Sequence, residues 1–395
     1  MDPSETVQPL AYVGAVTEAE AMQRALEAAA AWRGHVEPNP LVGCVLLRGA
    51  DEGEGEGEGE GEVVAVGAHQ RFGGPHAEAV ALEQARGAGH DVQGTTAVVT
   101  LEPCCHTGKT GPCTGALIAA GVARVVVAML DPDPRVAGGG VAALREAGVQ
   151  VSLLKPQAPA ARAAAELNAP FVKRVLRGLP YVTLKWAQTI DGRTATRTGD
   201  SRWISSGMSR LEVHRLRSRS DAVLVGRGTV EADDPALTVR LPADEPVPRI
   251  PVRLVASRTG RLPETASMLH DGGPEVRVLA GDLAQELSSL AASGMTHVMC
   301  EGGAGLAGAL LTHPAGLVDE LHLFLGPKLV LDDAAPGAIK APGPGILQMA
   351  DAVPWTLIGA DRLGDDVRLR YRVARQELDP SDPDQCEASA LGPTG

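Results

Sequence analysis

Short valine-rich stretches alternate with amphipathic stretches along the first 155 residues of this 395-residue chain. Helices are predicted over 17–34, which opens with a capping box of Thr17 and Glu20, and over 73–89, 113–122 and 141–149. Strands are predicted over 40–47, 62–70, 95–103, 123–132 and 150–154. Such elements bury their apolar sides by packing helices onto a sheet, so we expect a helix-flanked α/β sandwich over residues 1–155.

A Gly/Glu repeat, DEGEGEGEGEGE at 51–62, separates the first two predicted strands. The repeat has no apolar side chain to bury, so we expect a disordered acidic insertion at the tip of an antiparallel hairpin. It supplies seven of the negative charges behind the formal net charge of −13. That net charge argues against a general binder of the nucleic-acid backbone.

The composition, 44% hydrophobic and 22% charged, is typical of a soluble globular protein, and the length favours two domains. No apolar run reaches the roughly 18 residues that a membrane-spanning helix needs. The acidic N-terminus lacks the features of a secretion signal. We therefore expect a cytoplasmic protein, in whose reducing surroundings clustered cysteines bind metal or react more often than they form disulfides.

The segment TLEPCCHTGKTGPC, residues 100–113, holds three of the six cysteines. Upstream, PHAEAVAL places His76 and Glu78 at the start of a predicted helix. Helix starts favour thiolates, and a catalytic zinc needs three protein ligands with a fourth position open. His76 with two cysteines would supply that set, and Glu78 would stand close to the metal without being a ligand.

This arrangement is typical of zinc deaminases, in which the glutamate moves protons while the metal activates water. Their usual Cys-x-x-Cys pair is missing here. The side chains of the neighbours Cys104 and Cys105 diverge, so Cys113 is the remaining candidate for the third ligand. A closed structural zinc site, with Cys105 or His106 as fourth ligand, is the alternative, but it leaves the position of Glu78 unexplained.

A second alternating pattern begins at Tyr181, after a connecting segment with helical content that we place at 156–178. In its later part a predicted strand runs into a predicted helix across Gly303, Gly305 and Gly308, which spell G-x-G-x-x-G. Glycines there would let a pyrophosphate approach backbone N–H groups. The motif does not follow the first strand of its domain, so it is weak as a Rossmann fingerprint, and a tight turn with close packing explains it equally well.

Four segments, EPNPLVGCV, PHAEAVAL, TLEPCCHTGKTGPC and DPDPRVAGGG, together resemble the bifunctional deaminase–reductase family of riboflavin biosynthesis, RibD, which has the long cysteine spacing. The resemblance implies a cytidine-deaminase-like α/β/α sandwich. It implies that His76, Cys104 and Cys113 hold zinc, that Glu78 is the catalytic proton donor, and that Asn39 contacts the pyrimidine.

Four positions depart from the family's usual residues. Glu37 stands where the family commonly has histidine, and the other three lie in the cysteine segment. Cys105 stands where the family more often has serine, Lys109 replaces a common arginine and Gly111 a common proline. None of them removes an implied ligand, although a lysine at 109 cannot make the bidentate phosphate contact of an arginine.

The segments LKWAQTIDGRTA, SRWIS, RSRSDAVLVGRGTVEADDPALTVR and EGGAGLAGALL look like the reductase domain of the same family. The resemblance implies an NADPH-dependent, dihydrofolate-reductase-like domain over 179–378, followed by a disordered tail over 379–395. The residues implied to contact NADPH are Ala187, Trp203, Thr229, Asp233, Ser257, Gly303, Ala304, Gly305, Leu306, Ala307, Gly308 and Ala309. Those implied to contact the substrate are Ser201, Arg217, Leu237, Arg240 and Glu301. Lys185, two residues before Ala187, is a further candidate for the substrate.

The implied activity has two steps. The first is hydrolytic deamination of 2,5-diamino-6-ribosylamino-4(3H)-pyrimidinone 5′-phosphate, and the second is NADPH-dependent reduction of the ribosyl group of 5-amino-6-(5-phosphoribosylamino)uracil. We therefore expect small pyrimidine ribosyl phosphates as partners, neither nucleic acid nor membranes, and a homo-oligomer. A nucleoside or nucleic-acid zinc deaminase would have Cys-x-x-Cys and no reductase domain, and a non-catalytic zinc module would have four protein ligands.

Overall fold

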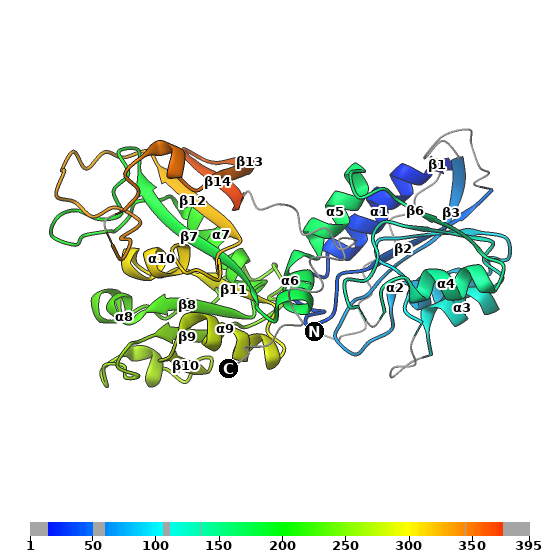
Figure 1. The fold of residues 1–395 in the computed structure, drawn as a ribbon, viewed down its shortest axis with the longest axis horizontal. Coiled ribbons are helices and arrows are strands. Elements are labelled where there is room, and N and C mark those ends of the chain that lie inside the picture. The colour runs from blue at the N-terminus through cyan, green and yellow to red at the C-terminus, as the bar shows by residue number, and fades with distance from the viewer. Residues whose placement is uncertain (1–14, 50–59, 106–110, 135, 344, 374–395) are drawn as a thin grey trace. The chain divides into compact units, whose positions relative to one another are not determined.

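The protein, seen as a computed structural model, is described over residues 15–49, 60–105, 111–134, 136–343 and 345–373 (Figure 1). The chain divides into two compact units, with the division between Leu176 and Arg177. Each unit is built around its own β-sheet. Across the described ranges, no helix combines the length and the apolar character that crossing a membrane would require.

The first unit has a six-stranded sheet in the order β1-β3-β2-β4-β5-β6. The first four strands in that order pair antiparallel, and β4, β5 and β6 pair parallel. The strands are β1 Ala15–Thr17, β2 Gly43–Arg48, β3 Glu60–Ala68, β4 Thr96–Val99, β5 Arg124–Val127 and β6 Gln150–Leu153. The helices are α1 Glu18–Ala30, α2 Ala77–Gly87, α3 Cys113–Ala119, α4 Gly139–Glu146, α5 Pro159–Leu167 and α6 Ala169–Arg177.

Helices cover both faces of this sheet (Figure 1). Because side chains alternate along a strand, Val45 and Leu47 of β2 join the core on the side of α1 and α5. Cys44 and Leu46 join the core on the side of α2, α3 and α4. The Thr17 side chain caps α1 in the expected capping box with Glu20. These three layers are the α/β/α sandwich that the sequence predicts.

The last three residues of the Gly/Glu repeat belong to a strand and not to the insertion that we expected. Glu60–Glu62 belong to β3, where they pair with β1, and Glu62 also pairs with Arg48 of β2. The expectation of disorder over 51–62 is therefore wrong for the last three residues. Alternating Gly and Glu also fits the two-residue period of a strand, and the neighbouring strands supply backbone hydrogen bonds. The remainder of the repeat lies outside the described residues, as does the expected tail at 379–395.

The expected connecting segment is mostly helical and contributes to the first core. Ala164, Leu167 and Val172, from α5 and α6, are buried in the cluster that also contains α1. Between these helices, the buried Asn168 accepts a hydrogen bond from the Leu41 N–H at 2.7 Å and donates one to the Leu41 carbonyl at 3.0 Å. The first core therefore continues past residue 155, through both helices.

The second unit has an eight-stranded sheet in the order β10-β9-β8-β11-β7-β12-β14-β13. Its strands are β7 Tyr181–Thr189, β8 Ala222–Gly226, β9 Val252–Ala256, β10 Val276–Leu279, β11 His297–Cys300, β12 Glu320–Gly326, β13 Trp355–Leu363 and β14 Asp366–Val373. Its helices are α7 Gly207–Ser218, α8 Arg227–Asp233, α9 Leu283–Ala292 and α10 Ala304–Leu311, with short 3₁₀ helices at Ser267–Leu269 and Met349–Asp351.

The six strands from β10 to β12 in this order run parallel, while β14 pairs antiparallel with both β12 and β13. Apolar residues of α9 and α10, including Leu287 and Leu310, pack with Leu184 and Leu254 of the sheet. The parallel strands present their carboxyl ends at one edge, which is where ligands bind in open α/β sheets. The loops and helix starts that follow β8, β9 and β11 carry most of the residues predicted to contact NADPH.

Candidate active sites

Three predicted metal ligands converge in the first unit. His76 is the N-cap residue of α2, Cys104 lies in the segment after β4, and Cys113 is the first residue of α3. The Nδ1 atom of His76 lies 3.5 Å from Sγ of Cys104 and 3.3 Å from Sγ of Cys113. The three ligand atoms all lie within 4.8 Å of one another.

This donor set fits zinc, which binds imidazole nitrogen and thiolate sulfur and keeps a position open in catalytic sites. The hydrogen bond shared with Cys113, assisted by those from His76 and the Cys113 N–H, lowers the pKa of Cys104 to about 4. The same shared bond, followed by burial, raises the pKa of Cys113. These opposite shifts favour negative charge on Cys104 first, and a bound dication would favour ionisation of both thiols.

The backbone around Cys104 directs its sulfur into this cluster. The Cys113 N–H donates to Cys104 Sγ at 3.3 Å, and the Thr114 N–H donates to the Cys104 carbonyl at 3.2 Å. Cys105 lies elsewhere, because a β-carbon at Gly139 would stand 3.0 Å from its Sγ. Among the described residues, the metal-binding group contains only the three predicted ligands. His106, the other candidate for a fourth ligand, lies outside the described residues, as does Lys109.

Glu78 is the second residue of α2, in the first turn of the helix, with 3% of its surface exposed. Burial raises the pKa of its carboxyl, against opposing contributions from its own backbone N–H and from His76. Its Oε2 is buried and has no hydrogen-bond partner within the described part of the chain. A buried carboxylate oxygen without a partner is costly in a purely structural role, but it is suited to exchanging a proton with a ligand.

A histidine that sequence reasoning missed connects Asn39 to the metal-binding group. His69 Nδ1 donates to the Pro75 carbonyl at 2.9 Å, so its Nε2 accepts the bond from Asn39 Nδ2 at 3.0 Å. The His69 ring packs edge to face on His76, with centroids 5.5 Å apart. Asn39 is thus held beside the site through one amide hydrogen, as its predicted pyrimidine contact requires.

In the second unit, three predicted substrate residues form a partly buried charge cluster. Glu301, which directly follows β11, accepts hydrogen bonds from Arg217 of α7 at 2.5 Å and 3.1 Å. Lys185 of β7 lies 3.6 Å from the same carboxylate. Burial alone would raise the pKa of Glu301, but the charges of Arg217 and Lys185 outweigh it and lower that pKa to about 2. Two cations face one anion, which leaves an excess positive charge that suits a phosphate group.

His214 is a second residue that sequence reasoning missed. Its Nδ1 lies 3.2 Å from the Thr238 carbonyl and 3.3 Å from the Arg240 backbone nitrogen. Arg217 donates to the same Thr238 carbonyl at 2.8 Å. Helix α7 therefore holds the loop that carries the predicted substrate residues Leu237 and Arg240. Leu237 is buried in this loop with a positive φ of 50°.

The predicted NADPH residues lie mainly at the carboxyl edge of the parallel strands. Thr229 of α8 accepts a hydrogen bond from the Gly303 N–H at 3.1 Å, which brings α8 to the start of α10. The other predicted contacts are Asp233 at the end of α8, Ser257 just after β9, Ala304, Gly305, Leu306, Ala307, Gly308 and Ala309 in α10, and Ala187 in β7.

The glycines of the G-x-G-x-x-G sequence do different things. A β-carbon at Gly308 would overlap the Lys340 carbonyl, so this glycine permits close packing. A β-carbon at Gly305 would meet no described atom within 4 Å, so packing does not require glycine there. Ser257 donates through its hydroxyl to the Arg261 carbonyl at 2.8 Å. Its hydroxyl therefore holds its own loop.

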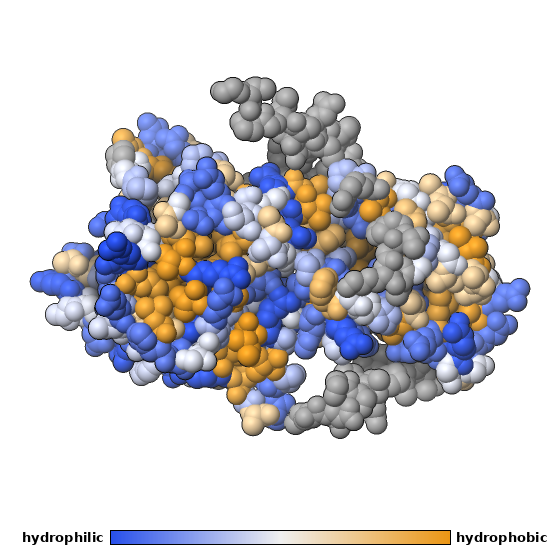
Figure 2. All heavy atoms as spheres, turned by 90° about the horizontal axis from the view of Figure 1, so that it is seen from below, coloured by the Kyte–Doolittle hydropathy of each residue, from blue (hydrophilic) through white to orange (hydrophobic). Residues whose placement is uncertain are grey.

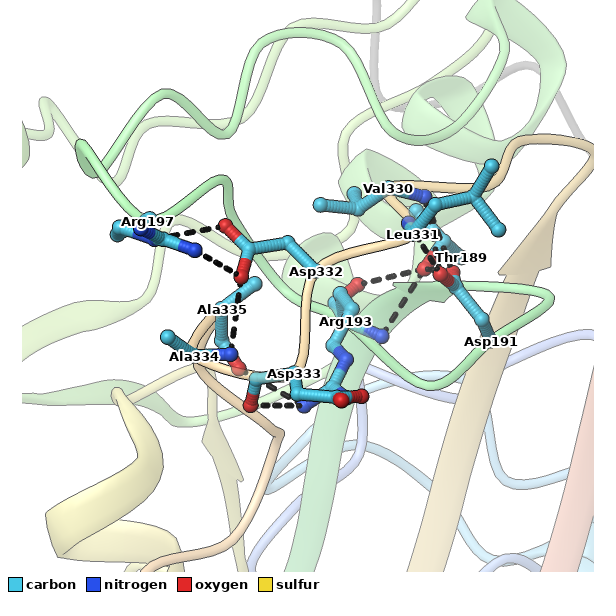
Figure 3. Close-up of polar contacts among 10 residues, drawn as sticks. All are labelled: Thr189, Asp191, Arg193, Arg197, Val330, Leu331, Asp332, Asp333, Ala334 and Ala335. Atoms are coloured by element: carbon cyan, nitrogen blue, oxygen red, sulfur yellow. Dashed lines mark hydrogen bonds and ion pairs between the residues drawn. The ribbon is translucent and has the colours of Figure 1, made fainter.

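Ser201 and Trp203 lie on the segment between β7 and α7, which is tied to the segment after β12 (Figure 3). The carboxylate of Asp191 accepts hydrogen bonds from the backbone of Val330 and Leu331 at 3.0 and 2.8 Å, and the Thr189 hydroxyl donates to it at 2.5 Å. These contacts fix the beginning of the segment to the chain that follows the adjacent strand.

Further contacts extend the attachment toward Trp203. Arg197 makes a bidentate pair with Asp332 at 2.9 and 2.7 Å, and Arg193 donates to the Ala335 carbonyl at 2.9 Å (Figure 3). Lys328 donates to the Trp203 carbonyl at 2.5 Å. The Trp203 ring is 60% exposed and stacks under the Arg210 guanidinium at 4.3 Å. The structure therefore presents an exposed aromatic ring on an anchored segment.

Comparison with known proteins supports the predicted class of each of the two domains. Residues 16–129 match the family model for the cytidine and deoxycytidylate deaminase zinc-binding region, and residues 180–369 match that for the RibD C-terminal domain. Riboflavin biosynthesis protein RibD of Escherichia coli is 40% identical over 381 residues, covering 88% of this chain and 97% of that protein. RibD of Bacillus amyloliquefaciens is 38% identical over 376 residues, covering 88% of this chain and 94% of its own length.

Solved structures show the same likeness. A crystal form of Acinetobacter baumannii RibD is 36% identical, covers 91% of this chain and 99% of its own, and has a TM-score of 0.77. A diaminohydroxyphosphoribosylaminopyrimidine deaminase/5-amino-6-(5-phosphoribosylamino)uracil reductase from Thermotoga maritima is 31% identical. It covers 90% of this chain and 99% of its own, and has a TM-score of 0.77.

The fold and the sites define a zinc-dependent deaminase joined in one chain to an NADPH-dependent reductase. The chain belongs to the RibD family of riboflavin biosynthesis. It is therefore a bifunctional enzyme, with zinc and NADPH as its cofactors.

Proposed function

We propose that the first unit deaminates 2,5-diamino-6-ribosylamino-4(3H)-pyrimidinone 5′-phosphate at a site built from His76, Cys104, Cys113 and Glu78. The observation that carries this assignment is the convergence of three ligand atoms beside the buried, unpartnered Oε2 of Glu78. In Thermotoga maritima the similar chain is a deaminase named for this class of pyrimidine.

In this proposal, His76, Cys104 and Cys113 hold the zinc ion. When bound, zinc acidifies a water molecule for attack on the amino-bearing ring carbon. Glu78 Oε2 would take one proton from the attacking water and deliver it to the ring nitrogen, and it would then carry the second proton, from the added hydroxyl group, to the amine that departs as ammonia. Asn39 would orient the pyrimidine through its amide oxygen, since its Nδ2 is engaged with His69. The buried position of Glu78 keeps its proton exchange away from bulk water.

The second unit is proposed to reduce the ribosyl group of 5-amino-6-(5-phosphoribosylamino)uracil. NADPH supplies the reducing equivalent when bound. Arg217 and Arg240 would hold the phosphate, with Lys185 and Glu301 at the sugar, and Ser201 and Leu237 would complete the substrate side. Ala187, Trp203, Thr229, Asp233, Ser257 and residues 303–309 would contact NADPH, whose phosphates suit the backbone N–H groups at the start of α10.

The test uses the full chain loaded with zinc. The diaminopyrimidine substrate is incubated with and without NADPH, and ammonia and the reduced pyrimidine are measured separately. Ammonia should appear in both reactions, and the reduced product only when NADPH is present. Release of ammonia from cytidine or from single-stranded DNA, with none from the ribosyl phosphate, would contradict the assignment of the substrate.

We also propose that the chain forms a homo-oligomer. One face of the second unit carries a broad group of apolar residues, at the left of Figure 2. Elsewhere in the same unit, Leu331, Leu347 and Met349 are 81%, 87% and 89% exposed. Apolar surface of this extent is commonly covered by a partner. Light scattering on the purified chain should give a multiple of the 40.8 kDa chain mass, and the mass of one chain would contradict the proposal.

The cytoplasm is the compartment that we propose for this enzyme. Cys44, Cys104, Cys105, Cys113 and Cys300 are all free thiols, and two of them are needed as zinc ligands. Reducing conditions keep such thiols available. Fractionation of cells that make the chain should recover it in the cytosolic fraction, and recovery from an exported fraction would contradict the proposal.

A further inference from the structure

Glu102 has a buried carboxylate with an unusual number of backbone partners. It lies two residues before Cys104 and is 4% exposed. Its Oε1 accepts hydrogen bonds from the N–H groups of Gly140 and Val141, at 2.8 and 3.0 Å. Its Oε2 accepts from the N–H groups of Gly138 and Asp131, at 2.9 and 3.2 Å. Four backbone donors, three of them at the start of α4, therefore converge on one side chain.

The backbone of Pro103, next to Glu102, also packs closely against the start of α4. A β-carbon at Gly140 would overlap the Pro103 carbonyl oxygen, so only glycine allows α4 to approach the segment here. The Glu102 N–H donates to the Met129 carbonyl at 3.0 Å, which fixes the other side of the same residue. Residues 102 and 103 are thus held against α4 and against the chain after β5.

This anchored segment leads directly into the metal-binding group. Cys104 follows Pro103, and its carbonyl and sulfur accept the hydrogen bonds from the first residues of α3. Contacts with α4 therefore fix the chain before the cysteine, and contacts with α3 fix it afterwards. Only Pro103 separates Glu102 from Cys104. Loss of the contacts between Glu102 and α4 would therefore move the Cys104 backbone and rotate its Sγ away from His76 Nδ1.

We propose that Glu102 is a positioning residue of the zinc site, which sets the geometry of Cys104 by docking the segment onto the start of α4. The inference rests on the proposed ligand role of Cys104. The hydrogen bonds of the Glu102 carboxylate among the described residues all come from backbone N–H groups, so its effect passes through the backbone. Groups that orient metal ligands commonly influence metal affinity by about 10- to 100-fold.

Glutamine cannot replace glutamate in this position. A carboxylate accepts hydrogen bonds at both oxygens, whereas an amide offers one oxygen and two N–H donors. In Glu102→Gln, two backbone N–H groups would face an amide N–H₂ group instead of an acceptor. The helix start also loses the negative charge that its dipole favours. The segment should therefore detach from α4 locally, although the chain length of the side chain is unchanged.

The experiment measures how fast zinc leaves the full-length chain. Zinc-loaded wild type and Glu102→Gln are mixed with a chromogenic chelator, and the release rate is followed by absorbance. We expect release to be about 10- to 100-fold faster in the variant. Cobalt(II) is then substituted for zinc, because its thiolate charge-transfer and d–d bands report the ligand geometry. Those bands should shift or weaken in Glu102→Gln.

A second variant and a control keep the test decisive if Glu102→Gln folds poorly. Gly140→Ala pushes on the same contact from the helix side and should change zinc release and the cobalt bands in the same way. Glu146→Gln, an exposed carboxylate of the same helix, should change neither. Wild-type release rates and bands in both Glu102→Gln and Gly140→Ala would overturn the inference. A wild-type chain that binds no zinc would instead overturn the proposed site itself.

Discussion

At the scale of single residues, the two proposed sites contain different kinds of buried charge. Glu78 has an oxygen with no protein partner among the described residues, whereas Glu301 has two cations as partners. The first arrangement leaves a carboxylate free to exchange protons, and the second holds it ionised. This contrast predicts distinct results when each group is altered.

Glu78→Gln removes the proton acceptor and preserves the size of the side chain. Deamination should fall by about 10² to 10⁴-fold, the usual contribution of positioned proton transfer. Zinc content, measured by metal analysis, should be unchanged, because Glu78 is not among the three ligands. Reduction of already deaminated substrate should proceed as in the wild type. Ammonia release near the wild-type rate would exclude Glu78 as the proton carrier.

The pKa of His214 offers a test of the charge cluster in the second unit. Burial lowers this pKa, and the positive charges of Arg217 and Arg240 lower it further. Arg217→Ala removes one of those positive charges and leaves Glu301 neutralised by Lys185 alone, and both changes favour the imidazolium form. The pKa of His214 should therefore rise, as measured by NMR titration of the ring. Arg215→Ala is the control, since Arg215 pairs with Glu245 instead, and the pKa should not move.

At the scale of elements, the attachment between the segments after β7 and β12 should assist NADPH binding. The Arg197–Asp332 pair lies on these two segments, and the first of them continues to Trp203 (Figure 3). Breaking the pair should loosen the segment and weaken NADPH binding by about two- to five-fold, as befits an exposed pair. Fluorescence titration with NADPH would measure this change directly.

A double-mutant cycle separates this ion pair from other effects of the substitutions. Arg197→Ala and Asp332→Ala should each weaken NADPH binding. The double variant should bind NADPH no more weakly than the single variant with the larger loss of affinity. Arg277→Ala breaks an exposed pair on β10 and should leave binding unchanged. Strictly additive effects of the two substitutions would show that the pair itself does not contribute.

Much of this architecture can be predicted from local sequence patterns. Thr17 and Glu20 mark the start of α1, and the valine-rich stretches around Cys44 and Val98 mark strands of the first sheet. His76, Glu78 and Cys104 could be proposed together because zinc deamination requires these residue types at the starts of helices. Cys113 was the remaining candidate for the third ligand because the side chains of Cys104 and Cys105 should diverge, and the resemblance supports the unusually long spacing between the two cysteines.

Other features depend on contacts between distant parts of the chain. The sequence around Glu102 does not indicate its role, because the hydrogen bonds that it accepts come from the backbone of Gly138 and Gly140, about 36 residues further along the chain. His69 and His214 act through partners that no local pattern connects to them. The start of β3 was misjudged because Glu60 belongs to a composition typical of disorder, while its pairing with Thr17 is a tertiary interaction.

At the scale of the whole molecule, each unit has its own sheet, its own buried core and a separate set of site residues. Arg217→Ala should therefore impair reduction and leave deamination intact. Loss of a charge-assisted phosphate contact costs about 1.5 to 3 kcal/mol, or roughly 10- to 150-fold in binding. Steady-state assays of both steps on this variant would measure the difference. Equal damage to both steps would mean that the units depend on each other.

Mixing two damaged enzymes extends this test. Glu78→Gln alone and Arg217→Ala alone should each fail to convert the diaminopyrimidine efficiently to the reduced product. A mixture should succeed, because Arg217→Ala supplies the deaminated intermediate and Glu78→Gln reduces it. Chromatography of the pyrimidines would follow both stages. A mixture that accumulates intermediate without reducing it would show that the intermediate must remain with one molecule.

The closeness of Cys104 and Cys113 also makes the empty site vulnerable to oxidation. Their sulfur atoms lie within 4.8 Å of each other, and the hydrogen bond that Cys104 shares with Cys113 lowers the pKa of Cys104, which favours its thiolate form. Thiolates are the form that oxidants and disulfides attack. Zinc and oxidant therefore compete for the same pair of sulfurs. A chain stripped of zinc in air should lose its capacity to take up metal until a reductant restores it. We therefore expect a newly made chain that meets oxygen before zinc to take up less metal than one that meets zinc first.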